Sequence, residues 1–179
     1  MRAILKAIDF VCDVGGVVAA MAAAALAVML IVEVALTSFA GISQPWAVEY
    51  SGYLLAVILF AGSGWTLRRG GHIRVNAVIG QLPSNAQRWL DIAASTFAIG
   101  LFLYVAIAVT GNAWRSFELG STSYYPTRTP IFYPQAILAA SFWLLLLAFV
   151  ARVARLLTGQ PPDAEASASL SAPPPDKPA

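Results

Sequence analysis

The sequence predicts an all-α integral membrane protein that crosses the bilayer as four transmembrane helices. Four long apolar runs alternate with short polar segments, and basic residues gather at alternate boundaries between them. Hydrophobic residues make up 59% of the 179 positions and charged residues only 11%, whereas a soluble domain carries about 25% charged residues. So few charges cannot cover a water-exposed surface, and lipid is therefore the expected solvent for most of the chain.

The transmembrane domain is expected over residues 14–157, and its first span over residues 14–36. That span holds about the 20 apolar residues that a helix needs to cross the hydrocarbon core, which favours a retained helix over a cleaved signal peptide. Gly15 and Gly16 would let another helix approach closely. Residues 1–13 fit either a short amphipathic helix at the membrane surface or an ordinary charged flank of the span.

Glu33 lies late in the first span, about 10 Å beyond its centre at 1.5 Å per residue. This depth is close to the far headgroup region. An ionisable residue within a span is a functional candidate by default. Near the boundary, a structural pair or a hydrated carboxylate is the simpler interpretation, and we favour it.

An uncharged loop precedes the second span, residues 48–67. Ser43 is expected to cap this helix, with Pro45 in its first turn. Glu49 is also expected in the first turn, where a carboxylate meets the positive end of the helix dipole. Trp46 suits a membrane interface. Trp46 and Glu49 therefore serve either as anchor and cap or as contacts for a partner subunit.

The second span ends in the densest cationic cluster of the chain, followed by a Gly-Gly pair that breaks the helix. A short interfacial helix is expected between the second and third spans, within residues 72–82. The residues of this cytoplasmic membrane-interface motif are Arg68, Arg69, Gly71, His72, Arg74 and Asn76. An ordinary position at headgroup level explains the histidine, and membrane topology explains the arginines.

The spacing of Ser84 and Gln87 predicts a capping box at the start of the third span, residues 89–114. Asp91 is expected in the first turn of that helix, where its charge suits the helix dipole. The interior of the span carries no charge.

Residues 115–133 form the longest loop between spans and are rich in aromatic and turn residues. Tyr124 and Tyr125 in this loop either rest on the membrane or dock another protein. The fourth span is expected over residues 134–153. The Pro-, Ala- and Ser-rich tail, residues 158–179, is expected to be disordered.

An even number of spans puts both termini on one side of the membrane. Nine basic residues fall on that side and two on the other, so the positive-inside rule predicts that both termini are cytoplasmic. The nine are Arg2, Lys6, Arg68, Arg69, Arg74, Arg88, Arg152, Arg155 and Lys177. Trp46, Glu49 and the tyrosine-rich loop would then face outward.

The sequence lacks the residues of an enzyme or of an energised pump. A single histidine excludes bis-histidine haem ligation within the chain, and no Cys or His cluster suggests a metal site. No Walker A sequence is present, and the net charge of +2 does not indicate a nucleic-acid partner. Because the deep parts of the spans are nearly free of charge, we expect a non-catalytic accessory bundle without a cofactor.

Several motifs occur in a specific order: Trp46-Ala-Val-Glu49, an apolar span with Gly62, Arg69-Gly-Gly-His72-Ile-Arg-Val-Asn76, and Leu82-Pro83. In this pattern the chain resembles the DctQ-type small membrane subunit of tripartite ATP-independent periplasmic (TRAP) transporters, over about residues 14–157. It departs from the family pattern at two positions. Glu33 stands near where the family commonly has an arginine, and Asn76 stands where it has an aspartate.

The resemblance implies a three-part uptake system in the bacterial inner membrane. A DctP-type periplasmic binding protein would capture a small organic acid, and a large DctM-type multi-span subunit would carry it with sodium. The small multi-pass subunit would be a scaffold that helps the binding protein dock. Its partner-contact candidates are Trp46, Glu49, Tyr124 and Tyr125. The basic motif would anchor the bundle at anionic lipid, where each cation contributes about 1 kcal/mol.

Two other functions remain as alternatives. One is a self-sufficient four-span cation or drug exporter, for which Glu33 is the only support. The other is the membrane anchor of a redox enzyme, which would need cofactor ligands from other chains.

Overall fold

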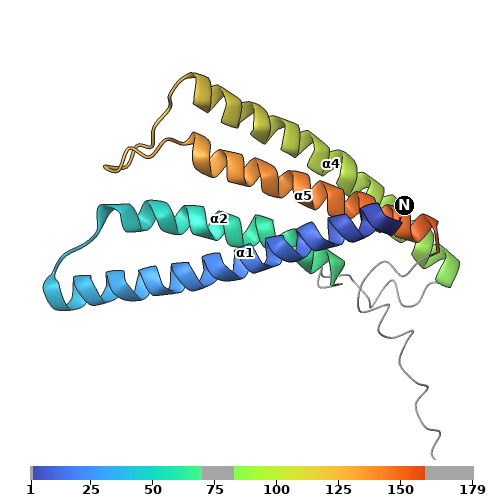
Figure 1. Cartoon of the computed structure of the whole chain (residues 1–179), viewed down its shortest axis with the longest axis horizontal. Coiled ribbons are helices and arrows are strands. Elements are labelled where there is room, and N and C mark those ends of the chain that lie inside the picture. Colours follow the sequence, from blue (N-terminus) through green and yellow to red (C-terminus); the bar gives the residue numbers. More distant parts are fainter. Residues whose placement is uncertain (1, 70–82, 160–179) are drawn as a thin grey trace, which may run out of the picture.

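The computed structural model describes residues 2–69 and 83–159. Its elements are α1 (Arg2–Ala35), the π-helical segment η1 (Leu36–Ala40), α2 (Pro45–Arg68), α4 (Ser84–Glu118) and α5 (Phe132–Leu157) (Figure 1). All four α-helices are long and apolar enough to cross a membrane, which confirms the predicted all-helical fold. The predicted interfacial helix, with Gly71, His72, Arg74 and Asn76, lies outside the described residues, as does the tail from residue 160.

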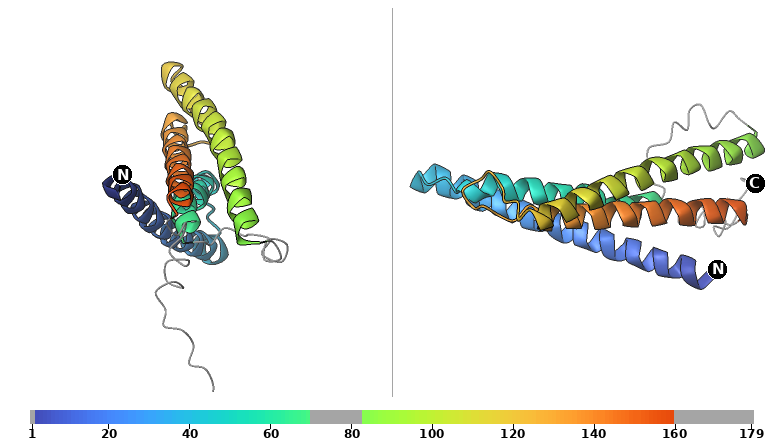
Figure 2. Two further views of the ribbon diagram at one scale, coloured as in Figure 1. Left: turned by 90° about the vertical axis from the view of Figure 1, so that its right-hand side faces the viewer. Right: turned by 90° about the horizontal axis from the view of Figure 1, so that it is seen from above.

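The helices form two antiparallel hairpins that pack through α2 and α5. The spatial order is α1, α2, α5 and α4, and α1 also contacts α5. The start of α1 and the end of α5 lie at the same end of the molecule (Figures 1 and 2). We call this the basic end, and we call the opposite end, where residues 36–44 and 119–131 connect the helices, the loop end.

α5 is the central helix of the bundle. Half of its most apolar stretch is buried, compared with 6% for α1. The core cluster combines Cys12, Leu67, Leu145, Ala148 and Phe149, so that α1, α2 and α5 meet around one centre. The outer faces of α1 and α4 therefore remain available to lipid or to another membrane protein.

The close approach of α1 to α2 depends on two glycines, as the sequence predicts. A Cβ atom on Gly15 would lie 2.7 Å from the carbonyl oxygen of Ala61, and one on Gly16 would lie 2.7 Å from the Trp65 ring. Any larger side chain would push the two helices apart.

α1 runs without a break from Arg2, so the predicted boundary at residue 13 falls inside a continuous helix. η1 then leads to Gly41, whose positive φ of 67° is a conformation that suits glycine.

α2 begins at Pro45, which confirms that this proline lies in the first turn of the helix, but two other predictions about this start are wrong. Gln44 holds the N-cap position without a side-chain bond, and Ser43 does not cap the helix. The Ser43 hydroxyl donates to Glu33 instead, at 3.0 Å. Glu49 falls outside the first turn, because the helix starts four residues before it.

The start of α4 also differs from the prediction. Pro83 holds the N-cap position with extended backbone angles, and its carbonyl accepts from the Ala86 N–H at 2.8 Å. Ser84 lies inside the helix, so the predicted capping box is wrong. The fixed φ of Pro83 sets the start of the helix in its place. Asp91 consequently lies beyond the first turn, and its carboxylate pairs with Arg152 of α5 at 2.9 Å.

Candidate functional site

The connection between α4 and α5 folds as a small hairpin, which we call the aromatic hairpin (residues 119–131). An antiparallel bridge joins Thr122 to Pro130, and the Ser123 N–H donates to the Thr129 carbonyl at 2.9 Å. Arg128 near its tip has a φ of 46°, a left-handed conformation that is uncommon for residues with side chains. These bonds give the loop a defined shape.

Glu49 of α2 holds the aromatic hairpin against the bundle. Its side chain is buried, with 3% of the residue exposed. One carboxylate oxygen accepts from the Thr127 hydroxyl in the hairpin, and the other accepts from the Tyr53 hydroxyl at 2.7 Å. A buried carboxylate requires such donors, and hydrogen bonds to a charged acceptor are among the strong ones. We call Glu49, Tyr53 and Thr127 the carboxylate clasp.

The other predicted partner-contact residues are exposed at the same end. Tyr124 and Tyr125 project from the hairpin, and Trp46 lies at the start of α2. Tyr50 links the two groups, because its ring packs edge-on against Trp46 with centroids 6.3 Å apart and its hydroxyl lies 3.4 Å from that of Thr129. The structure thus separates the four candidates into three exposed aromatics and one buried carboxylate.

Sequence reasoning missed Tyr53 and Thr127 as partners of Glu49. The spacing of Glu49 and Tyr53 was a usable signal, because residues four apart share a helix face. The contact to Thr127 had no comparable signal, since it joins residues 78 positions apart.

Glu33 fastens the other connection at the loop end. Its carboxylate accepts from the Ser43 hydroxyl at 3.0 Å and from the Gln44 N–H at 3.1 Å and 3.2 Å. The Thr37 hydroxyl lies 3.4 Å from it. These contacts favour the structural interpretation of Glu33, because they tie the end of α1 to the start of α2.

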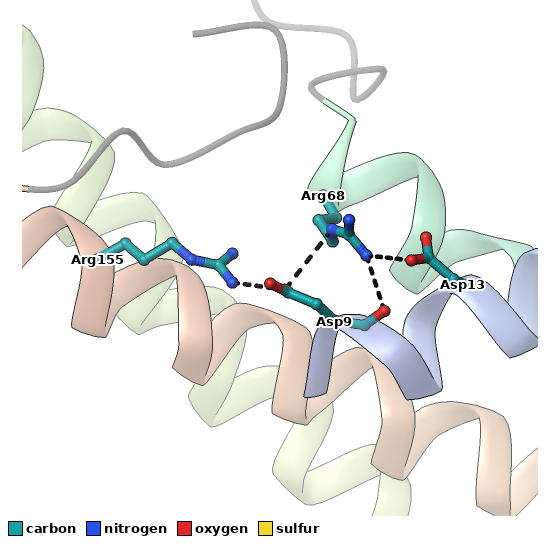
Figure 3. Close-up of polar contacts among 4 residues, drawn as sticks. All are labelled: Asp9, Asp13, Arg68 and Arg155. Carbon is teal, nitrogen blue, oxygen red and sulfur yellow. Dashed lines mark hydrogen bonds and ion pairs between the residues drawn. The ribbon is translucent and has the colours of Figure 1, made fainter. Parts of the chain in front are cut away.

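The basic end holds a further polar cluster, which joins three helices (Figure 3). Arg68 of α2 pairs with Asp13 of α1 at 2.7 Å and also donates to the Asp9 carbonyl at 2.8 Å. Arg155 of α5 pairs with the Asp9 carboxylate at 2.5 Å, and the Arg68 Nε lies 3.6 Å from the same oxygen. We call these four residues the aspartate clamp.

Other arginines at the basic end also have partners inside the bundle. Arg88 of α4 donates to the Leu156 carbonyl at 2.6 Å, which satisfies a carbonyl at the end of α5. The Arg69 guanidinium lies over the Trp65 ring, 4.7 Å from its centroid. The sequence explained these cations by topology alone, whereas the structure shows that Arg88 also joins α4 to α5 and that Arg69 packs on a tryptophan of its own helix.

Within residues 2–69 and 83–159, no group of three or more His, Cys, Asp or Glu residues could hold a metal ion. Both polar clusters at the loop end and the clamp at the basic end consist of groups that bind one another. Their arrangement supports the packing of the bundle and of its connections.

A family model described as "Tripartite ATP-independent periplasmic transporters, DctQ component" matches residues 26–159. The chain belongs to the DctQ family. The match extends from the last third of α1 through the end of α5, so it includes the aromatic hairpin and the carboxylate clasp. No curated protein matches the chain.

The family assignment confirms the resemblance seen in the sequence. The DctQ component is a non-catalytic subunit of a TRAP transporter, and the family implies a tripartite system with DctM and DctP components. The four candidate membrane-spanning helices agree with a membrane protein of such a system. Asp9 and Asp13 precede the matched residues, so the family model does not cover their part of the clamp.

Proposed function

We propose that this DctQ subunit is the scaffold of a sodium-coupled TRAP system that takes up small organic acids across the bacterial inner membrane. The observation that carries the proposal is the family match over residues 26–159. In this role the chain packs against a DctM-type subunit and helps a DctP-type binding protein dock. Substrate and sodium are bound by the partner proteins.

The outer face of α1 is the surface that we propose for the large subunit. It is the least buried of the four helices. It exposes a run of small side chains, including Ala20, Ala23, Ala24 and Ala25. Small residues support close packing between membrane helices, because they let the two backbones approach.

The aromatic hairpin and Trp46 are the surface that we propose for the binding protein. Exposed tyrosine and tryptophan are the residue types that most often carry binding energy at protein interfaces. Glu49 acts indirectly in this proposal: its carboxylate fixes the hairpin, and the hairpin presents Tyr124 and Tyr125. A preformed loop binds more tightly because less ordering is needed on association.

The proposal places the loop end in the periplasm and both termini in the cytoplasm. The basic residues of the sequence support this orientation through the positive-inside rule. Anionic lipid at the cytoplasmic surface would attract the basic end. The exporter alternative gains no support, because the Glu33 carboxylate binds the connection of its own chain.

The test is to purify the tagged full-length chain from membranes of its native host in mild detergent and to identify co-purifying proteins by mass. We expect a large multi-span protein in near-equal amount. A chain that is recovered alone, and that moves a cation in vesicles without help, would contradict the scaffold proposal.

A further inference from the structure

The aromatic hairpin contributes to the wall of a cavity of about 420 Å³ that lies between α2 and α5. Thr129 and Ile131 of the hairpin line this cavity together with Tyr53 and Ala56 of α2 and Leu138 of α5. The hairpin lies at the loop end, beside the start of α2 (Figure 1). It therefore covers the cavity at the loop end of the bundle.

Two contacts from α2 hold the hairpin in this position. Glu49 accepts from the Thr127 hydroxyl, and the Tyr50 hydroxyl lies 3.4 Å from that of Thr129. Tyr53 takes part in both structures, because its hydroxyl donates to Glu49 at 2.7 Å and the residue also lines the cavity. The carboxylate clasp and the cavity wall thus share a residue, so that a displacement of the hairpin would change both.

A strained residue lies between these two contacts. Arg128, which separates Thr127 from Thr129, has a φ of 46°. The left-handed conformation is costly for a residue with a side chain, and it persists where the surrounding contacts hold it in place. Loss of the contacts on either side would let Arg128 relax, so the strain favours an open hairpin once the clasp is broken.

We propose that the aromatic hairpin is a strained lid, held closed by the carboxylate clasp, which controls access from water to the cavity between α2 and α5. In the closed state Thr129 and Ile131 cover the loop end of the cavity. In the open state the wall of α2 below them is exposed. This gating requires only the folded chain and no partner protein, so it is independent of the docking proposed above.

The test measures how fast a membrane-impermeant maleimide labels Ala56→Cys in the full-length chain in nanodiscs. Ala56 lines the cavity, and lipid surrounds the helices, so the reagent reaches this position from the loop end. Cys12 is buried where α1, α2 and α5 meet, and the chain without Ala56→Cys gives its background. We expect Glu49→Ala to speed labelling at position 56 about fivefold, because the open population rises. Leu55→Cys, at an exposed neighbouring position outside the cavity wall, is the matched control and should label equally with and without Glu49→Ala.

Arg128→Gly and Arg128→Ala test the strain, because both remove the same side chain and only glycine adopts a positive φ readily. Position 56 should label about threefold faster with Arg128→Ala than with Arg128→Gly. Thr127→Ala provides a second release of the clasp if Glu49→Ala does not fold. Labelling at position 56 that neither Glu49→Ala nor Thr127→Ala accelerates would overturn the lid, and so would an equal acceleration at position 55, since the whole bundle would then be looser. Equal rates in the two Arg128 variants would overturn the strain.

Discussion

The carboxylate clasp makes the sharpest prediction about this subunit. Glu49→Ala removes the acceptor for the Thr127 and Tyr53 hydroxyls and should release the aromatic hairpin from α2. Hydrogen bonds to a charged group contribute about 1.5–3 kcal/mol each when both partners are buried. Tyr53 lies on α2 with Glu49, so only the bond to the Thr127 hydroxyl joins the hairpin to α2. Because the freed Thr127 hydroxyl lies at the end of the bundle and can bind water, we expect the release to become easier by about 1 kcal/mol.

Limited trypsin digestion in nanodiscs measures this release, because Arg128 is an exposed cleavage site in the hairpin. When opening is fast, proteolysis follows the open population. A change of about 1 kcal/mol should therefore speed cleavage after Arg128 about fivefold. Glu49→Gln should give a smaller increase, because the amide keeps one acceptor oxygen.

Thr127→Ala and the double variant with Glu49→Ala complete a double-mutant cycle. The double variant should cleave at about the rate of Glu49→Ala alone, because both changes remove the same bond. Glu118→Ala is the matched control, since this carboxylate at the end of α4 accepts from Trp114 at 2.8 Å. Cleavage that is unchanged by Glu49→Ala, or fully additive effects in the double variant, would refute the clasp.

Three further predictions address stability and docking. Asp9→Ala should destabilise the bundle by about 1–2 kcal/mol, because it removes a partner of two arginines in a partly exposed cluster. The unfolding temperature in detergent measures this loss. Lys6→Ala, a change at an exposed side chain, is the control and should unfold near the wild-type temperature. Gly15→Ala should lower the free energy of unfolding by about 1–3 kcal/mol, because the added methyl group overpacks the contact between α1 and α2. Gly100→Ala, where a Cβ meets open space, should be neutral or stabilising. Equal effects of the two changes would contradict the close α1–α2 contact. Tyr124→Ala should weaken the affinity for the binding protein about tenfold, as measured by surface plasmon resonance. Co-purification of the large subunit should stay unchanged. An unchanged affinity would argue against the hairpin as the docking surface.

The sequence was sufficient to predict the helices because lipid imposes a simple rule. Each span must form the hydrogen bonds of its own backbone internally and present apolar side chains over a known length. Composition and the length of the apolar runs therefore determine the number of helices. Helix starts were less predictable. Pro83 and Ser84 both carry start signals, and the proline prevailed because it fixes the backbone angle, whereas the serine offers only an optional bond.

The polar contacts were beyond sequence reasoning because they join distant residues. Glu49 could be recognised as unusual, yet its partner Thr127 belongs to a connection whose shape depends on the hairpin. The same holds for Asp9, which meets Arg155 across 146 positions. In both cases the sequence shows a charged residue near the end of a span, but its partner can be identified only from the folded structure.

The aspartate clamp also bears on the role of the first helix. A cleaved signal peptide would remove Asp9 and Asp13, the carboxylates that Arg68 and Arg155 bind, and with them Cys12 from the core. Partly buried arginines that lose their partners are costly, so we expect the start of α1 to be retained. The clamp includes residues before position 26, where the family match begins, and therefore holds α1 by contacts that the family pattern does not include. These contacts join the start of α1 to α2 and α5 at the end opposite the proposed docking surface.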